Sequence, residues 1–494
     1  MTTLISSRYA RWAAAILIFG TIFRLFYSTH LELVGDEAYY WLWSRHPDIC
    51  YLDKGPVIAW FISAGTALFG QTVFGIRFFA TLLALGTGIG IFFLARQLFS
   101  DQVAFWSVVA ATLTPLFAVG ATLMTIDTVY IFFWTLAALC FWYAKDQNRL
   151  GWWALTGVFV GLSMLSKYTG AIELVSFLGF CLWHRPSRVH FRRATLVTML
   201  LVVVLFLIPV LIWNWQHGFP TSHFLVHRGA LDERMRVRPL EVLSFLGQQA
   251  GVISPVLFLG LLVAVFWPAF APTPRVQTGY LVALFLPLFL VYLVLSFQKA
   301  SQANWAAAAY VSGLVLVAAK WCEAAKIYPW ARSVAVVGLT IAFLETALLH
   351  ETSWLHLPGR LDPLDRARGS RDLAGQVNAL QTSAAAPVVI ANKYMTASLL
   401  SFYLPGQPDT FMPVSSPPFN QLVLWPTYRE KHPAEDAIYV SDADRVLPSI
   451  RADFPDVRLT GAIVTSQDGR QVNRFYLFLC RRSEPFNKAA AASK

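Results

Sequence analysis

Hydrophobic residues form long runs over the first 350 residues of this chain, and charged, Pro and Gly residues separate the runs. Many of the runs approach the roughly 20 residues that an α-helix needs to cross a bilayer. Counting from one break to the next predicts about eleven spans. They are residues 11–28, 72–97, 102–122, 127–144, 151–167, 169–183, 195–214, 242–267, 278–297, 304–319 and 333–350.

The pattern changes after residue 350, where short β-rich runs alternate with helix-like stretches. The runs are PVVIA at 387–391, AIYV at 437–440 and RFYLFL at 474–479. This alternation is typical of a small α/β domain. The expected fold class is therefore mainly α, with a transmembrane helical bundle over residues 1–350 and a soluble α/β domain over residues 351–494.

Composition agrees with a membrane protein, because 56% of the residues are hydrophobic and only 14% are charged. The mean hydropathy of +0.53 lies well outside the range of soluble proteins. A net charge of +11 could suggest nucleic acid, but the Lys and Arg residues lie in short loops between apolar runs. No nucleic-acid motif occurs, so we expect membrane lipids and not nucleic acid as partners.

Basic residues also predict the orientation in the membrane. The loop at residues 184–193 contains four Arg residues, and the basic loops near Arg96, Lys145, Arg275 and Lys320 fall on the same side. Short loops rich in Lys and Arg face the cytoplasm. The first run lacks a small-residue cleavage site and is read as an uncleaved span in the inner (plasma) membrane. An odd number of spans then places the C-terminal domain on the extracytoplasmic side.

Two segments between the first and second spans are apolar or aromatic but too short to cross the bilayer. They are residues 38–43 and 57–69. Their composition suits helices that lie in the membrane interface. This first outer loop is therefore expected to be structured.

Two adjacent carboxylates, Asp36 and Glu37, immediately precede the aromatic segment of this loop. Carboxylates near a bilayer are costly, which favours a catalytic role. In the structural alternative, Asp36 caps a helix and Glu37 complements the helix dipole, together worth about 1 kcal/mol. The spacing alone does not decide between these interpretations.

Further polar residues are predicted to lie at the same outer face. Asp127 begins the fourth span, Lys167 lies between the fifth and sixth, and Lys299 and Asn304 lie between the ninth and tenth. Each has a simple alternative, since a lone Asp often caps a helix and a Lys at a helix end often extends to the lipid head groups. Four polar sites from distant parts of the chain at one face nevertheless favour a common site.

Several of these segments together resemble a known group of enzymes. They are DEAYYWLWS at 36–44, YLDKGP at 51–56, LSKYT at 165–169, IWNWQHG at 212–218 and NW at 304–305. This set is similar to bacterial relatives of the dolichyl-phosphate-mannose protein mannosyltransferases (family 39). The same superfamily, GT-C, includes the aminoarabinose transferases that modify lipid A (family 83). The resemblance covers most of the membrane part.

The resemblance implies an inverting glycosyltransferase, in which Asp36 and Asp127 match the two acids of the family and Lys167 matches its lysine. The predicted catalytic residues are Asp36, as the general base, with Glu37 and Asp127 in support. One motif departs from the family, because relatives commonly carry Asp-His-Pro-Pro where this chain has DKGP at 53–56. Lys54 is then expected to contact phosphate in place of that His. The predicted donor-phosphate ligands are Lys54, Lys167, Arg228 and Lys299. The predicted substrate-lining residues are Tyr39, Tyr40, Tyr51, Tyr168, His217, Asn304 and Trp305.

The chemistry explains these residue types. A sugar on a polyprenyl phosphate already carries its leaving group, so basic residues must offset the phosphate charge and a carboxylate must take the proton of the acceptor hydroxyl. The acceptor is a glycolipid such as lipid A, an envelope glycan or a protein. No cofactor is required, and no metal ligand set is evident. Glu37 either orients Asp36 or holds a divalent cation.

Two other classes of protein share some of these features. A transporter or flippase of lipid-linked sugars would have polar or Gly/Pro-broken segments at mid-membrane, ideally in paired halves. A scaffold protein would leave the Asp36–Glu37 pair with only a capping role. The gathering of chemical residues at one face, with no internal repeat, favours the transferase.

Overall fold

The computed structural model describes residues 7–192, 194–228, 238–298, 301–352, 355, 362–414, 418–467 and 470–482. The chain packs as two units. Unit 1 comprises Met1–Ser28, Asp48–Cys50 and Lys54–His350, and unit 2 comprises Thr29–Pro47, Tyr51–Asp53 and Glu351–Lys494. Most of the first outer loop up to Asp53 thus packs with the C-terminal part of the chain. The assignment of residues 1–350 and 351–494 to two domains stays a prediction.

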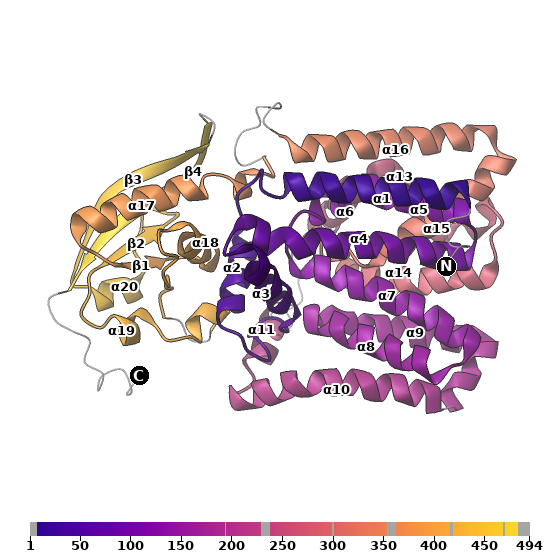
Figure 1. Cartoon of the computed structure of the whole chain (residues 1–494), viewed down its shortest axis with the longest axis horizontal. Coiled ribbons are helices and arrows are strands. Elements are labelled where there is room, and N and C mark those ends of the chain that lie inside the picture. The colour runs from indigo at the N-terminus through magenta and orange to yellow at the C-terminus, as the bar shows by residue number, and fades with distance from the viewer. Residues whose placement is uncertain are drawn as a thin grey trace. The chain divides into compact units, whose positions relative to one another are not determined.

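Unit 1 is a bundle of helices, and its long members run side by side (Figure 1). The helices are α1 (Arg8–Tyr27), α3 (Val57–Phe69), α4 (Val73–Leu98), α5 (Asp101–Leu113), α6 (Pro115–Gly120), α7 (Ile126–Gln147), α8 (Leu150–Ser166), α9 (Ala171–Trp183), α10 (Ala194–Gln216), α11 (Pro220–Arg228), α12 (Pro239–Ile253), α13 (Pro255–Phe266), α14 (Arg275–Leu295), α15 (Ala309–Ile327) and α16 (Pro329–His350). The short 3₁₀ turns η1 (Tyr168–Gly170), η2 (Arg185–Arg192) and η3 (Pro268–Phe270) join some of them.

Six described helices are long and apolar enough to cross a membrane, or seven if α12 and α13 form one broken span. The six are α1, α4, α7, α10, α14 and α16. The predicted polytopic helical fold is therefore confirmed. Other predicted spans correspond to shorter or divided helices, such as α8 with 17 residues and α9 with 13. The count of eleven stays a prediction.

The predicted continuous span over residues 242–267 is broken in the structure. Helices α12 and α13 meet at an angle of 109°. Ser254 between them has a φ of 75°, and Pro255 begins α13. Proline has no N–H to continue a helix, and a positive φ turns the chain away from the helical path. A hydropathy profile shows neither the missing N–H of the proline nor the positive φ, so it predicted one continuous span.

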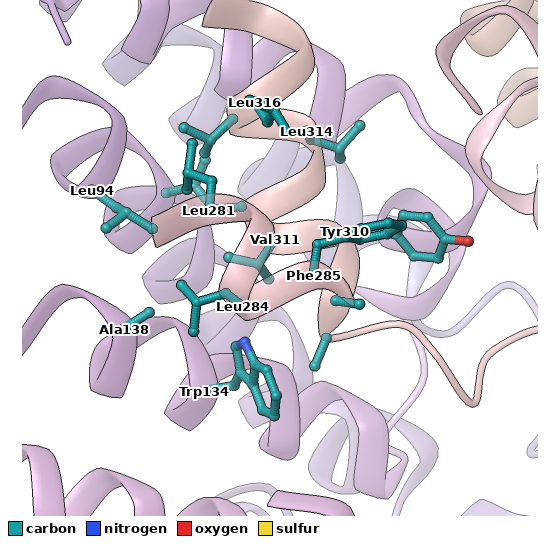
Figure 2. Close-up of a cluster of buried hydrophobic side chains, with 14 of the residues drawn as sticks. Leu94, Trp134, Ala138, Leu281, Leu284, Phe285, Tyr310, Val311, Leu314 and Leu316 are labelled. Carbon is teal, nitrogen blue, oxygen red and sulfur yellow. The ribbon is translucent and has the colours of Figure 1, made fainter. Parts of the chain in front are cut away.

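The core of unit 1 forms where α4, α7, α14 and α15 meet (Figure 2). Helix α15 is buried on all sides over an unbroken run from residue 309 to residue 320. A helix that is apolar all round is buried among other helices. Leu284 and Phe285 of α14 lie close to Val311 and Tyr310 of α15 in Figure 2. This packing fixes the positions of the ends of α7 and α15. The polar residues described below lie near these ends.

Unit 2 contains a four-stranded sheet with the order β1-β2-β4-β3. Strands β1 (Val388–Ala391) and β2 (Ala437–Ser441) are parallel, whereas β4 (Arg470–Arg481) pairs antiparallel with β2 and with β3 (Asp456–Gln467). The helices are α2 (Gly35–Arg45), α17 (Ser370–Ala384), α18 (Tyr394–Tyr403), α19 (Tyr428–Lys431) and α20 (Pro448–Asp453), with 3₁₀ turns η5 (Asp365–Ala367) and η6 (Gln421–Val423). The predicted small C-terminal α/β domain is confirmed.

Helix α2 packs tightly on α18 within unit 2. A Cβ atom on Gly35 would lie 2.5 Å from the Cβ of Met395, so only glycine allows this approach. Trp41 meets Phe402 edge to face, with ring centroids 5.0 Å apart. The predicted helices at residues 38–43 and 57–69 exist as α2 and α3, but aromatic side chains of α2 pack inside the protein. A location in the membrane interface stays a prediction for both.

Candidate active site

Asp127 is the centre of a buried polar cluster in unit 1. It lies in the first turn of α7, and both of its carboxylate oxygens accept hydrogen bonds from other segments. Lys167 Nζ donates to Oδ1 at 2.8 Å, and Asn304 Nδ2 donates to Oδ2. Thr125, and not Asp127, occupies the N-cap position of α7. The capping alternative for Asp127 is therefore wrong.

Lys167 turns inward and does not extend to the lipid head groups. It is the C-cap of α8, where its backbone N–H donates to the carbonyl of Ser163 at 2.9 Å. The residue is only 8% exposed, and its ammonium lies 5.6 Å from the ring centroid of Tyr130 and 6.0 Å from that of Tyr292. A carboxylate and two aromatic faces together stabilise a cation away from water. The head-group alternative for Lys167 is therefore also wrong.

Asn304 is held in place by a second buried network. Gln249 of α12 donates from Nε2 to the carbonyl of Ala303 at 3.1 Å, and Tyr310 Oη donates to Gln249 Oε1 at 2.8 Å. Trp305 donates to Gln302 and packs against Tyr292. Gln249, Tyr130 and Tyr292 were not predicted from the sequence. The available signal was a glutamine within an apolar run, at residues 248–249.

Glu173 on α9 is a further acid that the sequence analysis did not consider. It is fully buried, and among the described residues neither of its carboxyl oxygens has a hydrogen-bond partner. An acid in a membrane bundle that faces the protein interior commonly marks a functional region. It lies six residues beyond Lys167.

The loop at residues 48–56 contacts the segment that carries Lys167. Cys50 Sγ lies 3.5 Å from Tyr168 Oη, and its thiol also donates to the carbonyl of Lys54. A Cβ on Gly55 would lie 2.1 Å from the carbonyl oxygen of Leu165. The glycine of the DKGP sequence therefore permits a backbone approach that any side chain would prevent.

The IWNWQHG segment at the end of α10 contacts the start of this loop. Trp213 Nε1 donates to Asp48 Oδ2 at 2.8 Å, and the His217 ring stacks on Trp213 at 4.1 Å. His217 is exposed, and its substrate contact stays a prediction. The Lys54 ammonium lies 5.4 Å from the ring centroid of Phe224 in α11.

Asp36 and Glu37 belong to unit 2 and have different environments. Glu37 is fully buried, and its Oε2 accepts a hydrogen bond from the Val34 N–H at 3.1 Å. Glu37 therefore satisfies the start of α2, the role that the structural alternative gave to Asp36. Asp36 is half-buried, and its Oδ1 accepts a hydrogen bond from Tyr394 Oη at 3.3 Å. Asp36 is thus the more accessible of the two carboxylates.

The three predicted lining tyrosines of the first outer loop are largely structural. Tyr51 is fully buried, and its hydroxyl lies 2.9 Å from the carbonyl oxygen of Trp43 and 3.1 Å from that of His46. Its substrate contact stays a prediction. Tyr39 accepts from the Gln421 N–H at 2.7 Å and donates to Asp53. Burial raises the pKa of the Tyr39 and Tyr40 phenols well above the ordinary value, so both stay neutral.

Two predicted phosphate ligands cannot be placed. Lys299 lies outside the described residues, and Arg228 ends α11 with a side chain that is also outside the described set. Among the described residues, no three His, Cys, Asp or Glu side chains are grouped closely enough to hold a metal ion.

Known proteins resemble this chain in sequence. A family model described as dolichyl-phosphate-mannose-protein mannosyltransferase matches residues 53–213. The lipid A galacturonosyltransferase RgtD of Rhizobium johnstonii is 27% identical over 380 residues, which are 74% of this chain and 76% of the relative. An undecaprenyl phosphate-alpha-4-amino-4-deoxy-L-arabinose arabinosyl transferase of Pseudomonas savastanoi pv. phaseolicola is 25% identical, over 59% of this chain and 58% of the relative.

Solved structures show the same fold. The crystal structure of ArnT from Cupriavidus metallidurans bound to undecaprenyl phosphate matches with a TM-score of 0.62 and 17% identity. The match covers 94% of this chain and 98% of that one. The fold and the sequence relatives define a polytopic membrane glycosyltransferase. Together these similarities support a glycosyltransferase of the GT-C superfamily.

The Asp127–Lys167 contact is expected to couple stability and activity. Removing one partner of a buried ion pair typically costs about 3–5 kcal/mol, because the other charge is left uncompensated. We expect Asp127→Asn and Lys167→Met each to lower the thermal unfolding midpoint of the purified protein in detergent. The double variant should lose less stability than the sum of the single losses. Additive losses would show that the two side chains do not interact.

Gly55 provides a second test of the site. A methyl group there must displace the Leu165 carbonyl, which lies two residues before Lys167, so Gly55→Ala should lower both stability and transferase activity. Overpacking of this kind typically costs about 1–3 kcal/mol. Gly151→Ala is the matched control. Gly151 lies on α8, the helix that contains Leu165, and nothing lies within 4 Å of a Cβ atom added there. Equal thermal midpoints for the two variants would contradict the close approach.

Proposed function

We propose that the protein transfers a sugar from a polyprenyl-phosphate carrier to an envelope acceptor, with lipid A or a related glycolipid as the first choice. The relatives RgtD and the arabinosyl transferase are named for lipid A and for an undecaprenyl-phosphate sugar. The observation that carries the proposal is the buried Asp127–Lys167–Asn304 cluster, because three segments far apart in the chain meet there around one carboxylate. A protein with only a scaffold role would not need a buried charge pair at this position.

The proposal assigns Asp36 as the general base. An acceptor hydroxyl must lose a proton as it attacks the anomeric carbon, and a carboxylate ionised at working pH can take it. Glu37 is fully buried and bonded to the Val34 N–H, and Asp127 already accepts bonds on both oxygens. Of the three predicted acids, Asp36 is the most exposed. The dipole of α2 also favours its ionised form.

The departing carrier phosphate needs cations and no proton. Lys54, Lys167, Arg228 and Lys299 are the proposed ligands. Lys167 is already bound to Asp127, so its ammonium is held in a fixed position from which it contacts the phosphate. Lys54 lies beside the Phe224 ring, and its side chain is the one that adjusts to the phosphate. Direct displacement by an acceptor activated by one base gives inversion at the anomeric carbon.

A transporter or flippase remains the second candidate. The broken α12–α13 pair is the feature that favours it, because broken helices line substrate sites in many transporters. A repeat-based transporter has such breaks in corresponding positions of two halves. Among the described helices only one such bent pair passes the span criteria.

Lipid and glycan mass spectrometry with and without the gene tests the proposal directly. A missing sugar on lipid A or another glycolipid, with accumulation of the sugar-loaded carrier, is expected. Purified protein with carrier-linked sugar and acceptor, with and without a chelator, then tests turnover and metal dependence. Carrier lipid that crosses vesicle membranes without any sugar transfer would support the flippase instead.

The proposed topology places unit 2 outside the cytoplasm. Ser383 on α17 and Asn148 between α7 and α8 are both exposed and serve as labelling positions. Most native cysteines are buried, which keeps the background low. Ser383→Cys should react with a membrane-impermeant maleimide in intact spheroplasts. Asn148→Cys should react only after permeabilisation, and the reverse pattern would overturn the orientation.

Asp36→Asn tests the base directly. The amide keeps the shape and the hydrogen bond to Tyr394 but cannot accept a proton, so turnover should fall roughly 10²–10⁴-fold with little change in donor affinity. Glu37→Gln is the matched control, because its amide oxygen can still accept from the Val34 N–H. Near-normal turnover of Asp36→Asn together with an inactive Glu37→Gln would move the base assignment to Glu37.

A further inference from the structure

A cavity of about 670 Å³ in unit 1 is separate from the candidate active site. Helices α9, α13 and α14 form its walls, and α15 contributes Lys320. Arg275, the first residue of α14, also lines it. Tyr292, near the last residue of the same helix, lies beside Lys167. The cavity therefore begins at the end of α14 that lies away from the Asp127 cluster, and it extends along α14 to Pro287.

Two cations line this cavity. Lys320 is only 2% exposed, and its Nζ donates to the carbonyl of Ala271 at 2.6 Å. Arg275 is exposed, and its guanidinium carbon lies 6.0 Å from the ring centroid of Trp183. A lysine buried in a membrane bundle is costly and commonly marks a functional site. The cavity also lies at the end of the bundle that carries the predicted cytoplasmic loops.

The other residues that line the cavity are mainly apolar, and they extend along the axis of α14. From Arg275 to Pro287, the lining residues of α14 span about 18 Å at ~1.5 Å per residue. Half of a hydrocarbon core of about 30 Å is about 15 Å, so this length matches one leaflet. Val175 and Trp183 at the wall are 59% and 45% exposed, which opens the cavity toward lipid.

We propose that this cavity binds an anionic glycerophospholipid. Its head-group phosphate lies between Arg275 and Lys320, and one acyl chain follows Val282, Ala283 and Leu286 of α14. Basic pockets between transmembrane helices on the cytoplasmic side are established sites for acidic head groups. Trp183 is placed at the head-group level, where tryptophan is favoured. The site is independent of the donor and acceptor sites proposed above.

The test uses the full-length protein, delipidated in detergent. Phosphatidylglycerol should raise the thermal midpoint more than phosphatidylcholine of the same chains, because a ligand that binds only the folded state stabilises it. Brominated phosphatidylglycerol should quench tryptophan fluorescence, and Trp183→Phe should remove part of that quenching. Arg275→Gln should weaken phosphatidylglycerol binding about five-fold, the value for one lost cation near a phosphate.

Two further variants keep the test decisive. Ala283→Phe fills the cavity without changing charge and should abolish the lipid-specific stabilisation. Arg332→Gln, an exposed position near the start of α16 outside the cavity, should leave it unchanged. Equal effects of the two lipids, or full stabilisation of Ala283→Phe, would overturn the proposal. Preferential binding of undecaprenyl phosphate over phosphatidylglycerol would assign the cavity to the carrier and would also overturn it.

Discussion

The bonds to the Asp127 carboxylate are the interaction on which the arrangement of unit 1 depends. A charge pair inside a helical bundle is tolerated only when each charge has its partner and the remaining hydrogen-bonding positions are filled. Lys167 and Asn304 meet this requirement, and Gln249 and Tyr310 hold the turn that carries Asn304. The start of α7, the end of α8 and the turn before α15 are thereby fixed around one carboxylate.

The sequence allowed much of this arrangement to be predicted, because hydropathy and the spacing of polar residues are local signals. The apolar runs predicted the helices. Asp127, Lys167 and Asn304 lie at the ends of these runs, which predicted that they share one face of the membrane part. The direction of each side chain was not predictable. Whether Lys167 points to lipid or to Asp127 depends on partners that lie 40 residues or more away in the chain.

Other features that the sequence did not predict have local physical causes as well. Tyr51 was expected to line a substrate site, and its hydroxyl lies within hydrogen-bond distance of two carbonyls in unit 2. The break between α12 and α13 depends on one residue at positive φ, which leaves no hydropathy signal. Glu37 took the helix-start role expected for Asp36 because the first turn of α2 begins one residue earlier than the carboxylate pair.

The three predicted acids illustrate how hydrogen bonding can divide similar groups into different roles. Glu37 is buried and bonded to the start of α2, and protonating it would weaken the beginning of that helix. Protonating Asp127 would disrupt its bonds to Lys167 and Asn304 and leave a buried ammonium without its counter-charge. Neither acid can gain and release a proton in each catalytic cycle without repeatedly disturbing the fold. The proposed base, Asp36, is half-buried and is therefore more accessible than either of these acids to an acceptor hydroxyl that must lose its proton.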